Sequence, residues 1–135
     1  MIAMVCVDDS MGMLFNNRRQ SRDKVLISKI IEISNVSKLW INEFSRPLFD
    51  SFESQIMLIN DDFLQAADEG DYCFIENCSL SPYIEKIEKL IVFKWNREYP
   101  SDFSLDIDLS QWSLISTTDF KGNSHEKITM EVYKK

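Results

Sequence analysis

The sequence is poor in the residue types that mark several protein classes. Its 135 residues include three cysteines, three glycines, three prolines and one histidine. Cys6, Cys73 and Cys78 are odd in number and contain no C-x-x-C pair, so neither a disulfide framework nor a zinc site is indicated. Because so little glycine and proline leaves few flexible joints, and no linker is evident, we expect one domain over residues 1–135.

Charge and hydropathy exclude further classes. The formal net charge is −7, whereas a protein that binds duplex nucleic acid needs a basic face, so we expect no nucleic acid partner. The apolar run Met1–Val7 stops at Asp8 and Asp9. It is too short for a membrane span and lacks a basic leader, so we expect neither membrane insertion nor a signal peptide. Unpaired cysteines favour the reducing cytoplasm. These features do not determine the oligomeric state.

Hydropathy patterning predicts that strands and helices alternate. The predicted strands are Met1–Val7, Lys38–Asn42, Gln55–Ile59, Tyr72–Ile75, Lys89–Trp95, Trp112–Thr117 and Lys127–Tyr133. The predicted helical segments run from Ser21 to about Ile33, from Pro47 to about Glu53, near Asp61–Glu69 and from Ser81 to about Glu88. The expected fold class is therefore α/β with three layers: a mostly parallel central sheet, ending in an antiparallel C-terminal strand pair.

Several motifs at the two ends of the chain together form a recognisable pattern. They are Ile2–Val7, Gly12, Asn16-Asn17, Tyr99-Pro100-Ser101-Asp102, the D-L-x-x-W pattern that ends at Trp112, and Glu131–Tyr133. In order and spacing these motifs resemble those of dihydrofolate reductase, and the resemblance implies a dihydrofolate reductase-like fold. The chain also resembles short bacterial proteins that are sometimes labelled ribonuclease Z. A metallo-hydrolase of that kind needs several histidines around zinc, and His125 is the only histidine here.

Three stretches depart from the reductase family's motifs. Arg18–Arg22 replaces a Pro-Trp and a Leu-Pro before the first helix. Asn42–Arg46 replaces a glycine-containing motif that holds cofactor phosphate, and Glu76-Asn77 replaces a Gly-Gly pair that approaches the dinucleotide. Glu43 and Glu76 bring carboxylates to places where an anion would lie and where bare backbone would approach it. We therefore expect an eroded NADPH site without hydride transfer; the cofactor is otherwise unknown, and NADPH is expected only if the protein is a reductase.

Asp23 is the candidate catalytic residue. It matches the family's substrate-binding carboxylate on the first helix, so the resemblance implies that it holds a ring and supports protonation. The residues alone also allow a simpler interpretation, in which Asp23 is a first-turn acid that interacts favourably with the helix dipole.

The candidate ligand-binding residues are basic and aromatic. Arg18, Arg19 and Arg22 form a dense basic cluster with Lys24 at the start of the predicted helix. Cations are mildly unfavourable at a helix N-terminus, so an anionic ligand bound between them is one explanation. A solvated loop beside carboxylates is the other. Two aromatic residues in predicted loops are candidates to line the cleft at the carboxyl ends of the strands: Phe15 and Phe44.

Two further polar groups receive no predicted chemistry. His125 lies in a polar loop and is expected to be solvated. Asp102, Asp106 and Asp108 form an acidic loop, but the loop lacks the glycine and the closing glutamate of a calcium site. We therefore expect no bound metal.

Three functions remain open from the sequence. The first is a cytoplasmic protein that binds a small anionic or heteroaromatic ligand without hydride transfer. The second is a divergent NADPH-dependent pterin or folate reductase in which Asp23 is the acid. The third is a protein-interaction module whose arginine-rich loop docks an acidic partner.

Overall fold

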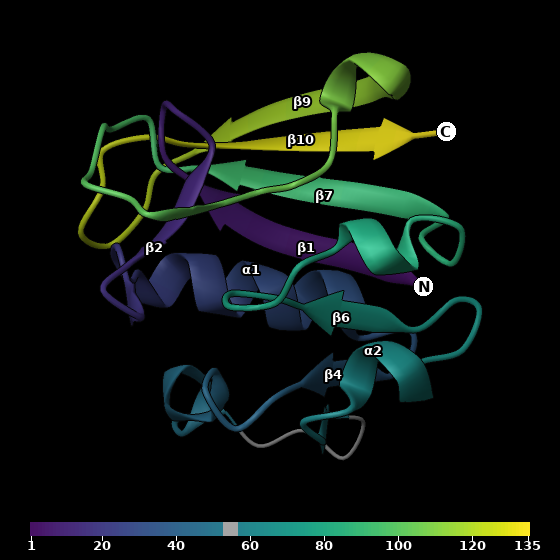
Figure 1. Ribbon diagram of the computed structural model, residues 1–135. Coiled ribbons are helices and arrows are strands. Elements are labelled where there is room, and N and C mark those ends of the chain that lie inside the picture. Colours follow the sequence, from purple (N-terminus) through teal and green to yellow (C-terminus); the bar gives the residue numbers. More distant parts are fainter. Residues whose placement is uncertain (53–56) are drawn as a thin grey trace.

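A seven-stranded sheet forms the centre of the computed structural model, which describes residues 1–52 and 57–135. The strands lie in the order β5-β4-β6-β1-β7-β10-β9 (Figure 1). Their bounds are β1 (Ile2–Val7), β4 (Leu39–Ile41), β5 (Met57–Ile59), β6 (Tyr72–Phe74), β7 (Lys89–Lys94), β9 (Ser113–Phe120) and β10 (Ile128–Lys134). The first five strands in that order are parallel, and β10 is antiparallel to both of its neighbours. The predicted α/β class is confirmed.

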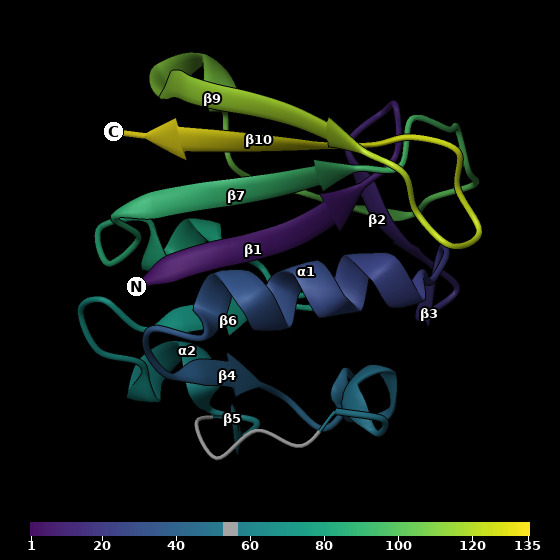
Figure 2. The same ribbon diagram turned by 180° about the vertical axis from the view of Figure 1, so that it is seen from behind.

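Side chains of β1 enter two separate apolar cores, one on each face of the sheet. Ala3 and Val5 point into one core, and Ile2 and Met4 point into the other. The second core is closed by helix α1 (Lys24–Ser34). Helix α2 (Phe63–Ala66) covers the opposite face, so that α1 lies in front of the sheet and α2 behind it in Figure 2. Burial on both faces explains why β1 is continuously apolar.

The helices differ from the sequence expectation at their ends. Helix α1 begins after Asp23 and not at Ser21, because the Asp23 side chain accepts hydrogen bonds from the N–H groups of Val25 and Leu26. The helix expected near Asp61–Glu69 is the single turn of α2. The helix ends early because Ala67 adopts an extended conformation, and the Asp62 side chain makes no capping hydrogen bond.

Three further segments are short 3-10 helices: η1 (Arg46–Phe49), η2 (Ser81–Tyr83) and η3 (Leu109–Gln111). A longer helix after Ser81 was expected. It is prevented because the chain must enter β7, where the Glu88 N–H donates to the Met1 carbonyl at 2.9 Å. The expected strand Gln55–Ile59 is described only as β5, since residues 53–56, including the end of the segment expected from Pro47, lie outside the described residues.

A small second sheet was missing from the sequence expectation. It has the order β3-β2-β8, with β2 at Gly12–Phe15, β3 at Arg18–Arg19 and β8 at Phe103–Ser104. Asn16 and Asn17 join the first two strands with φ values of 52° and 60°. Asparagine tolerates this left-handed conformation, and two such residues make the tight turn of a hairpin.

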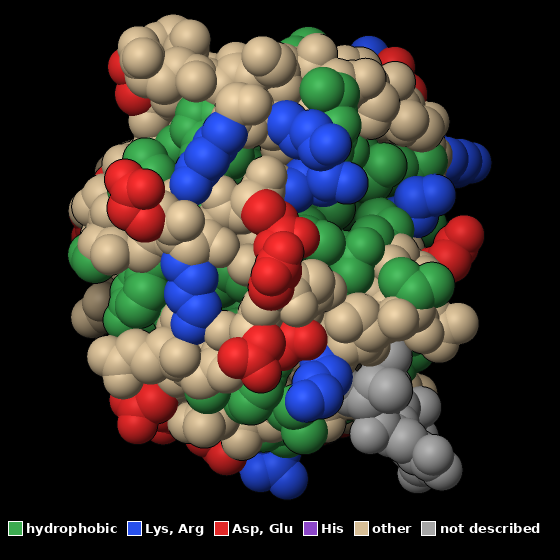
Figure 3. Space-filling view, turned by 90° about the vertical axis from the view of Figure 1, so that its right-hand side faces the viewer, with side chains coloured by type: hydrophobic (Ala, Val, Ile, Leu, Met, Phe, Trp, Pro, Cys, Tyr) green, Lys and Arg blue, Asp and Glu red, His purple; other side chains and the backbone are tan. Residues whose placement is uncertain are grey.

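The carboxyl ends of the parallel strands meet at one edge, on the left in Figure 1. Asp8 follows β1, Asn42 follows β4, Glu76 closely follows β6 and Trp95 follows β7. Ligands of open α/β sheets bind at such an edge. Figure 3 shows the other end of the molecule, where acidic and basic side chains mix around apolar ones. No helix among the described residues has the length and apolar character needed to cross a bilayer.

Phe49 tests the core between η1 and the sheet. Its ring is 1 % exposed and meets the Phe74 ring edge-on at a centroid distance of 5.7 Å. We expect Phe49→Ala to lower the free energy of unfolding by about 3–5 kcal/mol, because it removes a buried ring and leaves a cavity. Chemical denaturation measures the change. Val36→Ala, at a position that is 85 % exposed, should change it by less than about 0.5 kcal/mol. Equal effects of both variants would contradict this packing.

Candidate functional site

Asp23 occupies the first position of the site, at the N-terminus of α1. One carboxylate oxygen accepts hydrogen bonds from the N–H groups of Val25, Leu26 and Asn123 at 2.9, 3.3 and 2.8 Å. The other accepts the Ser124 N–H at 2.8 Å, the Ser124 hydroxyl at 3.3 Å and His125 Nδ1 at 3.0 Å. The carboxylate therefore fastens the start of α1 to the loop before β10.

These contacts determine the ionisation of Asp23. Burial by itself would raise the pKa of this carboxyl, but hydrogen bonds from Asn123, His125 and Ser124 outweigh burial and hold the pKa well below its usual range. A carboxylate in this environment keeps its charge at neutral pH. It is poorly suited to deliver a proton to a bound ring.

His125 is buried, which corrects the expectation of a solvated loop residue. The residue is 4 % exposed, and its ring stacks on Trp95 at a centroid distance of 4.5 Å. Its Nε2 lies 3.1 Å from the Ser21 hydroxyl and 3.2 Å from the Tyr99 hydroxyl. This burial is not predictable from the sequence pattern, because His125 and its partner Asp23 are 102 positions apart.

Glu76 and Arg19 form a second buried group at the end of β6. Arg19 Nε lies 2.9 Å from one oxygen of Glu76, and Nη2 lies 3.1 Å from the other. Ser45 donates to the same carboxylate at 2.7 Å. The Arg19 guanidinium also donates to the Phe44 carbonyl at 2.8 Å and lies over the Phe44 ring at 4.6 Å. Arg19 therefore neutralises Glu76 in a bidentate pair.

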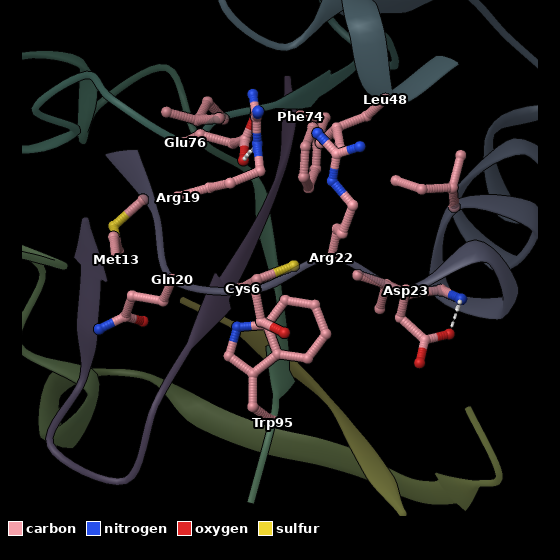
Figure 4. A pocket seen from close by; sticks show the side chains of 14 residues that line it. Cys6, Met13, Arg19, Gln20, Arg22, Asp23, Leu48, Phe74, Glu76 and Trp95 are labelled. Atoms are coloured by element: carbon pink, nitrogen blue, oxygen red, sulfur yellow. Dashed lines mark hydrogen bonds and ion pairs between the residues drawn. The ribbon is translucent and has the colours of Figure 1, made fainter. Parts of the chain in front are cut away.

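An inner cavity lies between these two groups, and its volume is about 20 Å³. Its lining side chains, most of which Figure 4 labels, are Cys6, Met13, Arg19, Gln20, Ser21, Arg22, Asp23, Leu26, Ile27, Leu48, Phe74, Ile75, Glu76 and Trp95. Such a volume holds about one water molecule and no ring. Among the described residues, the buried Gln20 Oε1 has no hydrogen-bond partner, which a single water would satisfy.

Cys6 contributes no nucleophile to the inner cavity. Desolvation by burial, followed by the nearby charges of Glu76 and Asp23, raises the pKa of the Cys6 thiol well above its ordinary value. The sulfur therefore stays protonated at neutral pH, and a protonated thiol is a poor nucleophile.

An outer groove opens beside the inner cavity, between the start of α1 and η1, with a volume of about 490 Å³. Its lining residues are Arg22, Asp23, Lys24, Ile27, Pro47, Leu48, Ser51, Phe52, Asn123 and Ser124. Arg22 lines both spaces, and in Figure 4 its guanidinium points toward Phe74 and Leu48 and away from the Asp23 carboxylate. This volume falls in the range of small-molecule pockets, which is about 300–1,000 Å³.

The structure separates the residues that the sequence grouped as ligand-binding. Arg22 lines both spaces, whereas Arg19 lines only the inner cavity and is paired with Glu76. Phe44 lies beneath Arg19 and lines neither space. Arg18 and Phe15 are exposed on the β2–β3 hairpin, and neither lines the inner cavity or the outer groove. Three residues of the site were not among the ligand-binding candidates from the sequence: His125, Leu48 and Phe52.

The acidic loop also has a structural place. Asp106 accepts hydrogen bonds from the Leu80 and Ser81 N–H groups at the start of η2, at 2.9 and 3.2 Å. Within residues 1–52 and 57–135, no group of three or more His, Cys, Asp or Glu side chains could hold a metal ion.

Comparison with known proteins identifies the fold. A solved structure of dihydrofolate reductase from Enterococcus faecalis, complexed with NADP(H) and RAB-propyl, matches over 98 % of this chain and 94 % of that chain, with a TM-score of 0.66. The fold is dihydrofolate reductase-like. Sequence identity is 14 %, so the match extends to the fold alone.

The sequence comparisons add no family. No protein-family model matches the sequence, and no curated protein matches it. The resemblance to dihydrofolate reductase is thus supported at the level of the fold. The resemblance to short proteins labelled ribonuclease Z is not supported.

Asp23→Asn tests the charge at the start of α1. Asparagine caps a helix as well as aspartate does, so the variant keeps the cap while it removes the charge and replaces one accepting oxygen by a donating NH2 group. We expect a loss of about 3 kcal/mol in unfolding free energy at neutral pH, as for one partner of a buried pair. Because the pKa of Asp23 is lowered by folding, its contribution is complete above the unfolded pKa, about 3.9, and declines as pH falls below it.

The measurement is urea denaturation from neutral to acidic pH. The difference between wild type and Asp23→Asn should shrink as the pH falls. Asp108→Asn replaces an exposed cap of η3 and serves as the matched control, with little change expected at any pH. A difference for Asp23→Asn that does not depend on pH would contradict a charged Asp23.

Proposed function

We propose that this protein binds a small amphipathic anion in the outer groove and performs no hydride transfer. The ligand class is an aromatic or heteroaromatic body with a carboxylate, sulfonate or phosphate group. The observation that supports this most is the pair of cations at the groove: Arg22 and Lys24 take part in no ion pair among the described residues.

The groove has the composition that such a ligand needs. Ile27, Leu48 and Phe52 supply apolar walls. Asp23 is the one acidic side chain in the lining, against the two cations Arg22 and Lys24. The net formal charge of the lining is therefore positive, and apolar contact provides affinity while the cations provide orientation.

Closure of the inner cavity supports the loss of the NADPH site. The Glu76 carboxylate stands where the reductase family carries a Gly-Gly pair, and Arg19 and Ser45 hold it there. A cavity of about 20 Å³ cannot admit a nicotinamide ring. The residues that line the inner cavity therefore do not fit the cofactor.

The other two functions have less support. A reductase needs Asp23 to assist protonation, whereas its pKa is lowered and all of its lone pairs are engaged. An interaction surface built on three arginines loses its middle member, because Arg19 is paired with Glu76. Cytoplasmic location and a single domain over residues 1–135 stay predictions.

Arg22→Ala tests the groove with a pair of matched dyes. We expect wild type to bind 8-anilino-1-naphthalenesulfonate more tightly than the uncharged N-phenyl-1-naphthylamine. Arg22→Ala should weaken binding of the sulfonate roughly fivefold to tenfold, equivalent to about 1 kcal/mol for a partly exposed ion pair. Binding of the uncharged dye should change little. Fluorescence titration measures both affinities.

Arg18→Ala is the control for that experiment, since Arg18 is exposed and lies outside the groove lining. It removes the same charge and should leave the affinity for the sulfonate almost unchanged. Equal losses for Arg18→Ala and Arg22→Ala would show that only general surface charge attracts the dye.

Calorimetric titration with NADPH tests the eroded cofactor site. We expect no saturable heat, and no loss of NADPH absorbance when dihydrofolate is added, because the Glu76–Arg19 pair closes the cleft. Saturable binding would defeat the proposed erosion. Turnover by wild type that is lost in Asp23→Asn would establish the reductase function instead.

A further inference from the structure

Three side chains beside the inner cavity lie in line. Asp23 Oδ2 is 3.0 Å from His125 Nδ1, and His125 Nε2 is 3.1 Å from Ser21 Oγ. The ionised carboxylate can only accept, so His125 Nδ1 donates to it. On the other side of the ring, Nε2 faces a hydroxyl that can donate. This is the order of atoms found in Ser-His-Asp acyl-transfer sites, which are recognised by geometry and not by sequence position.

The carboxylate and the imidazole are more buried than the hydroxyl, as such a site requires. The side chains of Asp23 and His125 are 0 % and 2 % exposed. Trp95 stacks on the imidazole and fixes the plane of the ring. Ser21 is half-buried and lines the inner cavity. Water and substrate can therefore reach the hydroxyl while the two supporting groups stay dry.

We propose that Ser21 is the nucleophile of an acyl-transfer site, with His125 as general base and Asp23 as the group that orients the imidazole. The substrate class is an activated carboxylic ester that carries an anionic group. The location of that anionic group, at Arg22 and Lys24, rests on the function proposed above. The acyl-transfer chemistry rests on the Asp23–His125–Ser21 geometry alone.

The two spaces suit the two parts of such an ester. The inner cavity has room for little more than a carbonyl group, and the outer groove has room for a ring with its anion. Arg22 is exposed and lines both spaces. Arg22 is therefore one of the side chains that the two spaces share.

The reaction balances with water as the only other reactant. Ser21 Oγ attacks the carbonyl carbon while its proton passes to His125 Nε2, which forms a tetrahedral oxyanion. The ester C–O bond then breaks, and the alkoxide takes that proton and leaves as an alcohol. Water, deprotonated by the same nitrogen, attacks the acyl-serine and releases a carboxylic acid and free Ser21.

Two backbone N–H groups next to Ser21 are free of backbone partners. Among the described residues, the N–H groups of Arg22 and Asp23 donate to no backbone carbonyl. The N–H that follows the nucleophile commonly supplies one donor of an oxyanion hole. The free donor on Arg22 therefore supports Ser21 as the attacking group.

The Tyr99 hydroxyl lies 3.2 Å from the same Nε2 and competes with Ser21 for its lone pair. Tyr99→Phe removes the competitor and leaves Ser21 as the sole hydroxyl at this nitrogen. We expect faster reaction of Ser21 in this variant. A variant that no longer reacts would identify Tyr99, and not Ser21, as the reactive hydroxyl and would overturn the proposal.

The decisive experiment treats the full chain with a fluorophosphonate reporter and maps the modified peptide by mass spectrometry. We expect one phosphonyl group on Ser21 in wild type and none in Ser21→Ala. His125→Asn should react at least roughly 100-fold more slowly, the usual contribution of a general base. Ser28→Ala removes an exposed serine of α1 and should react like wild type. Circular dichroism checks the fold of each variant.

Hydrolysis of p-nitrophenyl acetate and p-nitrophenyl hemisuccinate by the same variants supplies a second readout. We expect release of p-nitrophenol to be faster from the anionic ester and to disappear in Ser21→Ala. If wild type takes no label, or if Ser21→Ala is labelled equally, Ser21 is not a nucleophile and the network is structural. Labelling of Ser21 without dye binding would instead reject the groove function alone.

Discussion

One buried carboxylate sets the arrangement of this end of the molecule. Asp23 keeps its charge out of water because six hydrogen bonds replace its hydration, two from the first turn of α1 and the others from the loop before β10. The loop can come this close only because Gly122 has no side chain: a Cβ there would lie 2.5 Å from the Asp23 carboxylate. The Asp23 carboxylate therefore connects the start of α1 to the loop before β10, beside the apolar core that α1 shares with β10.

A second carboxylate changes what the dihydrofolate reductase-like fold can hold. Glu76 is buried and must be neutralised, and Arg19 does this from the β2–β3 hairpin while lying over Phe44. Both charges are thereby withdrawn from any ligand, since a buried bidentate pair leaves little attraction for a third group. The positive charge that stays available lies farther out, at Arg22 and Lys24. The proposed ligand space is for this reason the groove beside α1 and not the crevice of the sheet.

The sequence predicts the sheet well and the site only in part. The alternation of apolar and polar side chains at Ile128–Tyr133 and the continuous apolar run at Met1–Val7 predict strands from local pattern alone, and the structure has strands there. The Asn16-Asn17 pair is a hairpin signal from which the β2–β3 turn is predictable. The burial of His125 is not predictable from local pattern, since it depends on Asp23, 102 positions away. The Arg19–Glu76 ion pair is not predictable for the same reason, because only the fold brings these two residues together.

The Asp23–His125 pair also explains how a structural fastening can have reactive character. The hydrogen bonds to Asp23 keep that residue ionised, so its oxygen accepts from His125 Nδ1 and orients the imidazole. Stacking on Trp95 fixes the plane of the ring. The contacts that hold the loop in place therefore also aim Nε2 at the Ser21 hydroxyl, and the proposed acyl transfer rests on that geometry.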